Sequence, residues 1–427
     1  VRLSSSDIEP WLLSLGASYP GLGLGLAVEL DAQADFANDL LVLEGIRGAL
    51  GEVSVAGDLN VRLANGQRDI SGALVLDEIT LDPFAETVFG QEALSPSERM
   101  WPEAPFSPAA APPFFADVGI TASRVHAGGA DLSDASFTLK LDREGLGIDD
   151  LRAAYAGGRL TGRGELKNPS GTGILSAQFA LENARVASDG LSANVSVAGT
   201  VTGSGKSLES LVGSLAGSGT IHLADVAIRG LDAGAFPELL ARADAVGRDI
   251  SAAAINSFAP ELVAAGPFEG GSADIAYTIA AGVLRAPPVT MHDGETSLTA
   301  EPRIDLNNAS LSLTGTLTYE AGDAAVTGAV PEVNFEVAGP IGQAEMSYDI
   351  VPLTQFLTQR ALEKEQARVE AMQAVLLEGQ RLRREARYYA ALQAERERKA
   401  AEERLAAEEA ARQKALEEYE RRAAAQR

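Results

Sequence analysis

Apolar and polar residues alternate with a period of two along much of this chain. In one run, Phe137, Leu139 and Leu141 alternate with Thr138 and Lys140. Successive side chains of a β-strand point to opposite faces of its sheet, so this pattern predicts a strand with one apolar and one polar face. Similar short runs recur, bounded by Gly, Asn, Asp or Ser, which is typical of successive antiparallel strands.

The apolar positions of these strands are predicted to line one face of a long sheet, with the other face in water. We take twelve of them as candidates for lining a groove. They are Phe137, Leu139, Leu141, Phe179, Leu181, Val195, Val197, Ile275, Tyr277, Ile279, Leu311 and Leu313. Alternation alone does not distinguish a face that binds lipid from one that packs against a second sheet, so both interpretations stay open at each position.

Three segments interrupt the alternation. Residues 82–116 contain seven prolines, which predicts a linker or an excursion from the sheet. Residues 207–265 carry apolar residues at helical spacing, such as Phe236 and Leu239, on both sides of one short predicted strand. The last segment, 353–427, is rich in Ala, Glu, Arg, Leu and Gln and almost free of Gly and Pro, which predicts a long helix.

The sequence therefore predicts a mainly β protein. Its long twisted antiparallel sheet would form an open groove or partial barrel, with a short helical insert and a long C-terminal α-helix. The predicted segments are β repeats over 1–81, a proline-rich linker or excursion over 82–116, β repeats over 117–206, a mixed helical insert with one strand over 207–265, a C-terminal β segment over 266–352 and a charged helix over 353–427.

The charge is distributed unevenly. The formal net charge is −25, and the helical segment 353–427 holds 16 basic and 14 acidic residues, so the negative charge lies in 1–352. An acidic body argues against a nucleic-acid backbone as the main partner and against simple docking on anionic lipid heads. The chain has no cysteine, which excludes disulfides, thiolate metal sites and cysteine nucleophiles.

Motifs for catalysis are weak. The sequence GSGKS at 203–207 resembles the end of a phosphate-binding loop, but Thr200 stands where that motif needs glycine. The sequence GLGLGL at 21–26 lacks dinucleotide-binding spacing and is predicted to form a strand. The three histidines lie far apart at 126, 222 and 292, without a second ligand at metal-binding spacing. We expect no enzymatic activity, no cofactor and no metal site.

The predicted helix 353–427 carries an apolar seam near its start, and Val375, Leu382 and Tyr389 fall seven residues apart. We expect residues 353–392 to dock or to form a weak coiled coil. Glu–Arg pairs would stabilise the remainder in water. A solvated tail and a specific partner site are both open interpretations.

The order of segments in the C-terminal half is distinctive. Residues 207–232 read SLESLVGSLAGSGTIHLADVAIRGLD, a helix-like stretch followed by a strand and a Gly-Leu-Asp turn. After short predicted helices, residues 270–315 read as three strands, and 330–357 as a closing strand that leads directly into the Glu/Arg-rich helix. In this order, 205–350 resembles the C-terminal region of the AsmA family, of the alphaproteobacterial type.

This resemblance implies a periplasmic, non-enzymatic protein of outer-membrane biogenesis, held at the inner membrane by an N-terminal anchor. The chain begins at Val1 without a signal-like segment, so we expect targeting and anchor segments upstream. The family is thought to move phospholipid toward the outer membrane along a groove. The implied partners are phospholipid, the membrane and an envelope protein at helix 353–427, with no nucleic acid. The family transfers no catalytic residue.

The leading hypothesis is therefore a protein that binds or conducts phospholipid acyl chains along an apolar sheet face. The alternative is a structural or adhesive β-repeat protein that binds protein partners and oligomerises through the C-terminal helix. An enzyme is the third hypothesis, and it rests only on the loop at 203–207.

Overall fold

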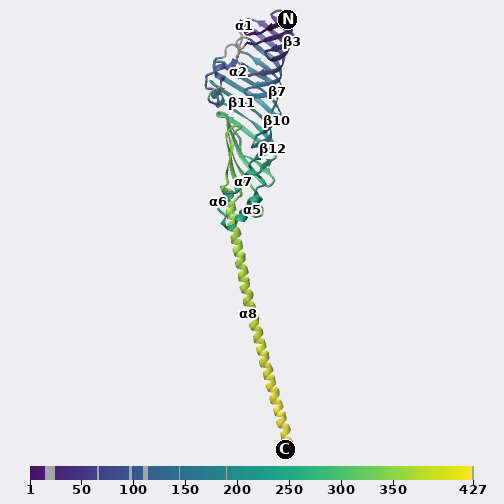
Figure 1. Cartoon of the computed structure of the whole chain (residues 1–427), viewed down its shortest axis with the longest axis vertical. Coiled ribbons are helices and arrows are strands. Elements are labelled where there is room, and N and C mark those ends of the chain that lie inside the picture. The colour runs from purple at the N-terminus through teal and green to yellow at the C-terminus, as the bar shows by residue number, and fades with distance from the viewer. Residues whose placement is uncertain are drawn as a thin grey trace. The chain divides into compact units, whose positions relative to one another are not determined.

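The chain forms two compact units, Val1–Thr358 and Gln359–Arg427, in the computed structural model (Figure 1). The first unit contains the whole sheet, and the second is helical. The residues that the structure describes are 1–14, 25–64, 67–95, 99–108, 114–143, 145–188 and 190–425. The predicted Gly-Leu strand at 21–26 lies mostly outside them.

One sheet of twenty strands makes up the first unit. Its first half consists of β1 (Arg2–Ser5), β2 (Val28–Ala37), β3 (Leu40–Leu50), β4 (Val53–Ala64), β5 (Gln67–Thr80), β6 (Phe115–Ala127), β7 (Ala130–Leu141), β8 (Gly145–Tyr155), β9 (Gly158–Lys167) and β10 (Gly173–Ala187). Its second half consists of β11 (Leu191–Gly205), β12 (Ala216–Arg229), β13 (Pro267–Gly270), β14 (Ala273–Ala280), β15 (Val283–Arg285), β16 (Val289–Asp293), β17 (Thr296–Asp305), β18 (Ser310–Thr318), β19 (Glu332–Pro340) and β20 (Glu345–Asp349).

Almost all neighbouring strands pair antiparallel. The exception is β5 with β6, which pair in parallel because the chain crosses from one end of β5 to the opposite end before it begins β6. Among the described strands, β1 and β20 do not pair with each other, so the sheet stays open. The predicted mainly β fold with a long open sheet is confirmed.

Two-residue turns keep the strands in step. β6 and β7 are joined by Gly128 and Gly129 alone, with φ values of 54° and 84°. Turns with positive φ at both central residues match the right-handed twist of the flanking strands, and glycine adopts them without steric cost. Such a turn fixes the register, so the alternating apolar residues of both strands stay on the same face.

The helices lie mainly in two of the segments that interrupt the alternation. They are α1 (Glu9–Ser14), α2 (Asp82–Phe89), α3 (Gln91–Leu94), α4 (Leu208–Gly213), α5 (Phe236–Val246), α6 (Ala252–Asn256), α7 (Ala259–Ala264) and α8 (Val351–Ala424). The excursion 82–116 thus contains α2 and α3, and the insert 207–265 contains four helices and β12. This strand is longer than the predicted short strand.

A large apolar cluster fills the C-terminal end of the first unit. It joins the apolar residues of β12–β19 to α5–α7 and to the first residues of α8. Leu353 and Phe356 of α8 are fully buried, and the Phe356 ring lies 5.9 Å from the ring of Phe236 on α5. We call this group the C-terminal core.

A second cluster lies under the excursion. Val88, Phe89 and Ala93 from α2 and α3 are buried against β6–β9, together with Ile120 and Phe137. We call this group the excursion core. The two cores bury different parts of the same sheet, and both use helices rather than a second sheet as the covering layer.

The predicted C-terminal helix is confirmed, and its 74 residues give α8 a length of about 110 Å. Asp349 Oδ1 accepts a 3.0 Å hydrogen bond from the N–H of Val351, where the helix begins. Beyond the first unit, α8 is exposed, and its charged side chains pair within the helix, as Arg381 does with Glu378 at 2.7 Å. Pairs of this kind stabilise a helix that has few tertiary contacts.

Replacing Phe356 with Ala should lower the free energy of unfolding by about 3–5 kcal/mol, because it leaves a cavity in the C-terminal core. Urea unfolding followed by circular dichroism would measure the change. Leu362→Ala on the same helix is the control, since Leu362 is 59% exposed and its replacement should cost less than about 0.5 kcal/mol. Equal effects of the two variants would contradict the assignment of Phe356 to the core.

Candidate functional site

The register of the strands places all twelve predicted groove residues on one face of the sheet. Leu181 on β10 pairs with Val197 on β11, which pairs with Ile221 on β12, which pairs in turn with Ile275 on β14. Directly paired residues lie on the same face, so these rows extend the alternation of single strands into a continuous surface. We call it the apolar face.

The twelve residues have three different environments. Phe137, Leu139 and Leu141 are buried in the excursion core, and Ile275 and Tyr277 in the C-terminal core. Val195, Val197, Ile279 and Leu313 are partly buried against the C-terminal core. Phe179, Leu181 and Leu311 are half-buried to a similar degree but belong to neither core. The apolar face is thus filled at two places and incompletely covered between them.

Glycines form part of the surface between the two cores. In one row, Gly162 on β9 pairs with Phe179, Phe179 with Gly199, Gly199 with Gly219, and Gly219 with Tyr277. A methyl group added at Gly199 would collide with the hydroxyl of Tyr277. The Tyr277 ring therefore extends over the two glycines, toward β10.

Phe335 on β19 makes the same kind of contact with Gly315 on β18. A methyl group added at Gly315 would collide with the Phe335 ring. Sequence reasoning missed these glycines as parts of the surface. The sequence does contain a signal for them: in the alternating runs, these glycines stand at positions where an apolar residue is expected.

The excursion begins at one end of the strands, beside the β6–β7 turn. The N–H of Leu81 donates to the carbonyl of His126 at 2.8 Å, and the N–H of Gly128 donates to Asp82 Oδ1 at 2.8 Å. Both hydrogen bonds hold the start of the excursion beside the β6–β7 turn. From there α2 crosses the apolar face and contacts β8 and β9.

The same segment is fixed at the opposite ends of the strands by three further hydrogen bonds. Asn168 Nδ2, just after β9, donates to the carbonyl of Val88 at 2.7 Å, and the N–H of Phe106 donates to the carbonyl of Lys206 at 2.7 Å. Trp101 Nε1 donates to the carbonyl of Leu306, between β17 and β18, at 2.7 Å. The described residues of 81–108 therefore span the apolar face from one end of the strands to the other, and we call them the strap.

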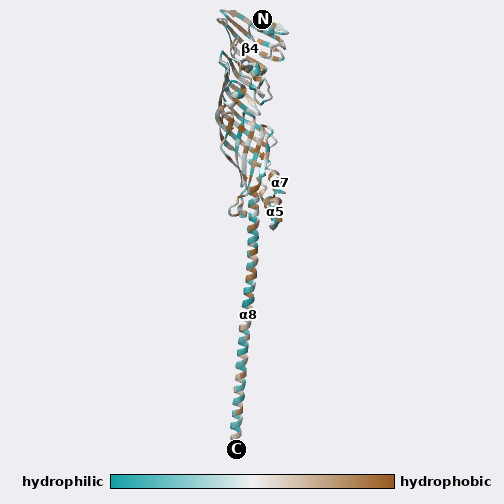
Figure 2. Cartoon of the chain, turned by 90° about the vertical axis from the view of Figure 1, so that its left-hand side faces the viewer, coloured by the Kyte–Doolittle hydropathy of each residue, from teal (hydrophilic) through white to brown (hydrophobic). Residues whose placement is uncertain are grey.

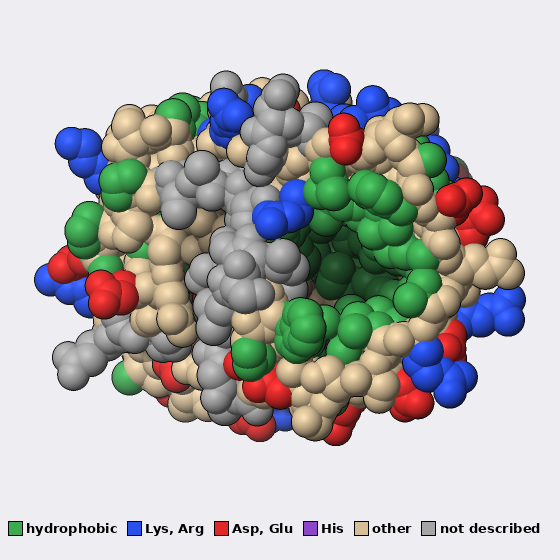
Figure 3. Space-filling view, turned by 90° about the horizontal axis from the view of Figure 1, so that it is seen from above, with side chains coloured by type: hydrophobic (Ala, Val, Ile, Leu, Met, Phe, Trp, Pro, Cys, Tyr) green, Lys and Arg blue, Asp and Glu red, His purple; other side chains and the backbone are tan. Residues whose placement is uncertain are grey.

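The N-terminal end of the first unit is hollow. Figure 3 shows this end, with hydrophobic side chains lining a deep opening. β3, labelled at this end in Figure 1, and its neighbour β4 carry apolar-face residues that remain partly exposed, such as Leu43 and Val61. Phe36 on β2, which pairs with β3, is 60% exposed. Figure 2 shows hydrophobic positions continuing along the strands of the first unit. Apolar surface of this extent in a folded protein commonly marks a binding site.

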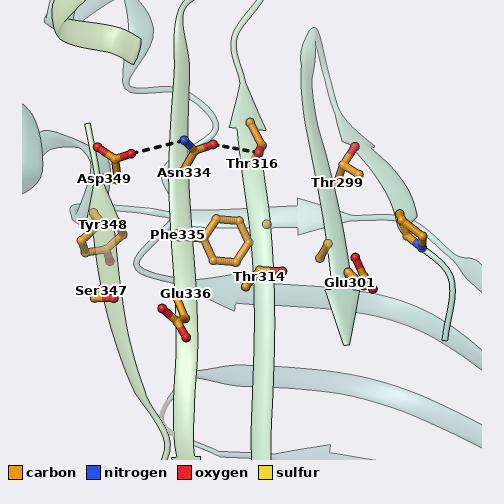
Figure 4. Close-up of a pocket in the computed structure, with 13 residues that line it drawn as sticks. Thr299, Glu301, Thr314, Thr316, Asn334, Phe335, Glu336, Ser347, Tyr348 and Asp349 are labelled. Atoms are coloured by element: carbon orange, nitrogen blue, oxygen red, sulfur yellow. Dashed lines mark hydrogen bonds between the residues drawn. The ribbon is translucent and has the colours of Figure 1, made fainter. Parts of the chain in front are cut away.

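The opposite face of the sheet is polar. Figure 4 shows a shallow concavity on β17–β20, in which Asn334 donates to Asp349 at 3.4 Å and accepts from Thr316 at 2.9 Å. These side chains alternate with Phe335 and Tyr348, which belong to the apolar face. Their polar groups pair across strands, as is usual for the solvated side of a sheet.

The GSGKS loop has its own internal hydrogen bonds. Ser210 Oγ accepts from the N–H groups of Lys206 and Ser207 at 2.8 and 2.9 Å, and Ser207 Oγ accepts from the N–H of Ser210 at 3.2 Å. This is a capping box for α4. The N–H groups that a phosphate would need are thus engaged by serine side chains.

The three histidines lie on strands, at 126 on β6, 222 on β12 and 292 on β16. His222 Nδ1 is 2.7 Å from Asp274 Oδ1, and His126 Nδ1 is 2.6 Å from Asp131 Oδ1. Within the described residues, no group of three or more His, Cys, Asp or Glu side chains is arranged to hold a metal ion.

The apolar residues of α8 beyond the first unit are exposed. Val375, Leu382 and Tyr389, the residues spaced by seven, are 72%, 53% and 64% exposed. Leu376 and Leu377 are also exposed, at 62% and 64%. Three successive apolar residues point in directions about 100° apart on a helix, so they do not form a single narrow stripe.

Comparisons with known proteins found no match for this chain among protein-family models, curated proteins or solved structures. Of the helices in the described ranges, none is both long enough and apolar enough to cross a membrane.

Replacing Gly199 with Ala should destabilise the protein by about 1–3 kcal/mol, because the new methyl group displaces the Tyr277 ring. In a Tyr277→Ala background the same change should cost at least about 1 kcal/mol less, since the ring is gone. Urea unfolding of the four proteins would give this coupling.

Gly164→Ala is the matched control on the same face, where the added methyl group has its nearest neighbour at 3.6 Å. It should change stability little. Strictly additive effects of Gly199→Ala and Tyr277→Ala would contradict the contact between the Tyr277 ring and Gly199.

Proposed function

We propose that the apolar face of Val1–Thr358 binds acyl chains of phospholipids without chemical change. One observation carries the proposal: a band of half-exposed apolar side chains, including Phe179 and Leu181, lies between two filled cores on the face whose hydrophobic side chains line the hollow of Figure 3. Water in contact with this surface is unfavourable, and an acyl chain replaces it at a gain of about 0.8 kcal/mol per buried CH₂.

The acidic charge of the first unit fits this binding mode. Residues 1–352 carry the negative charge of the chain, so anionic lipid heads are not attracted by the protein surface. Affinity would therefore come from the acyl chains rather than from the heads. The polar face, rich in paired Thr, Asn, Asp and Glu side chains, would keep the protein in solution while the apolar face is occupied.

The biological setting that we propose is the bacterial periplasm, in an AsmA-like protein of outer-membrane biogenesis anchored at the inner membrane. This part of the proposal rests on the sequence resemblance of 205–350. The order of elements supports it: α4, β12, the helices α5–α7, the strands to β20 and then α8 follow one another as the resemblance implies.

The alternative function, oligomerisation or partner binding through the C-terminal helix, has one observation in its favour. Val375, Leu382 and Tyr389 are exposed at a spacing of seven residues. Because Leu376 and Leu377 are exposed beside them, the helix lacks the narrow seam that a coiled coil uses, and we favour the acyl-chain proposal.

Mass spectrometry of lipids extracted from the purified full chain tests the proposal. The wild-type protein should carry phospholipid, and Phe179→Glu combined with Leu181→Glu should lose most of it, because charged side chains are costly beside acyl chains. These residues lie outside both cores, so the variant should remain folded by circular dichroism.

Gln178→Glu is the control, because Gln178 lies between these strand positions on the exposed polar face of β10. It should retain the wild-type amount of lipid. A folded wild-type protein without lipid, which also takes up none from vesicles, would contradict the proposal.

A further inference from the structure

Tyr277 has an unusual position for a polar group. It lies in the middle of β14 on the apolar face and is only 3% exposed. Its ring extends over Gly219 and Gly199, the two glycines that separate it from Phe179 in the same row. The hydroxyl therefore reaches the part of the apolar face that neither core fills.

This hydroxyl makes no hydrogen bond with any residue that the structure describes. Two tyrosines elsewhere in the same half of the sheet differ from it. The Tyr319 hydroxyl donates to the carbonyl of Asp232 at 3.0 Å, and the Tyr348 hydroxyl donates to the carbonyl of Gly230 at 2.7 Å. Buried hydroxyl groups are normally paired, so an unpaired one in a native structure calls for an explanation.

The hydroxyl of Tyr277 is not fully enclosed, although the residue as a whole is buried. Among the described side chains, the fully enclosed polar atoms without a partner are Gln67 Oε1 and Asn168 Oδ1, and the Tyr277 hydroxyl is not one of them. Its neighbours along the row are two glycines and the half-exposed Phe179. A single polar group beside apolar surface is the composition by which binding sites orient an apolar ligand.

We propose that the Tyr277 hydroxyl donates a hydrogen bond to a carbonyl oxygen at the head of a bound acyl chain. This inference rests on the proposed function and adds a specificity to it: the site selects chains that carry a carbonyl over chains that lack one. Two sources supply this chemistry, the ester of a phospholipid and the carboxyl group of a free fatty acid. A hydroxyl can donate to an oxygen of either group.

The glycines are part of this specificity. With side chains at Gly199 and Gly219, the ring could not lie across the sheet and its hydroxyl would not reach the open part of the apolar face. Tyr277 is thus a specificity-determining residue that the two glycines position.

Competition binding to the full chain tests this inference. A fluorescent fatty-acyl probe would be displaced by a diester phospholipid, by the diether phospholipid with the same head and chains, and by palmitic acid. The diether lacks only the carbonyl groups. Wild-type protein should bind the diester roughly 3–10-fold more tightly than the diether, the range that one neutral hydrogen bond provides. Tyr277→Phe should bind both equally.

The three competitors distinguish the two sources of the carbonyl group. An ester preference that Tyr277→Phe abolishes assigns the site to phospholipid esters. Loss of palmitic acid affinity in Tyr277→Phe, without an ester preference in the wild type, assigns it to free fatty acids. Equal binding of all competitors by both proteins overturns the role of Tyr277 and leaves acyl-chain binding standing. Failure of the wild-type protein to bind any of them overturns the proposed function as well.

Thermal melting gives a second readout on the ligand-free protein. Tyr277→Phe should melt at the wild-type temperature or above it, because it removes a hydroxyl that has no partner among the described residues. Tyr348→Phe is the control, since it removes a paired hydroxyl: it should melt lower and keep the wild-type ester preference. A lower melting temperature for Tyr277→Phe would mean that its hydroxyl is already bonded within the protein, which overturns the inference.

Discussion

The register of strand pairing is the constraint on which the rest of this structure depends. Rows such as Leu181, Val197, Ile221 and Ile275 run across the sheet because each strand pairs with its neighbour in step. If one strand slipped by one residue, all its apolar side chains would move to the face that is in contact with water. The same register that assembles the apolar face also creates the need to cover it. The protein covers it in different ways along the sheet: with α5–α7 and the start of α8, with the strap, and incompletely between them.

The sequence was most informative about which side each strand residue occupies. Alternation depends only on the geometry of an extended chain, so the common face of Phe137, Val197 and Ile279 could be predicted without knowing which strands pair. The long helix was equally accessible, because its composition changes abruptly after residue 352. What covers the apolar face was not predictable in this way. Phe137 and Phe179 have the same alternating pattern, yet one is buried under the strap and the other is half-exposed.

Covering elements depend on contacts between residues far apart in the sequence. Proline content indicated that 82–116 leaves the sheet, but it did not indicate that α2 and α3 return across the apolar face or that β5 and β6 pair in parallel. The hydrogen bond from Trp101 to Leu306 joins residues 205 positions apart. The contact between Tyr277 and Gly199 is of the same kind, since both residues read as ordinary members of alternating runs. Such contacts follow from the folded topology and leave little local signal.

The proposed function follows from the incomplete covering rather than from the fold. A sheet whose apolar face is filled along its whole length has no need of a ligand, and the two cores show that this protein fills its face where helices reach it. Photo-crosslinking with a phospholipid that carries a diazirine in its acyl chain tests the central claim most directly, when the modified residues of the full chain are mapped by mass spectrometry. We predict crosslinks at alternate positions, at Phe179, Leu181 and Val197, and none at Gln178. Crosslinks confined to the polar face or to α8, or an absence of crosslinks to the sheet, would contradict the account.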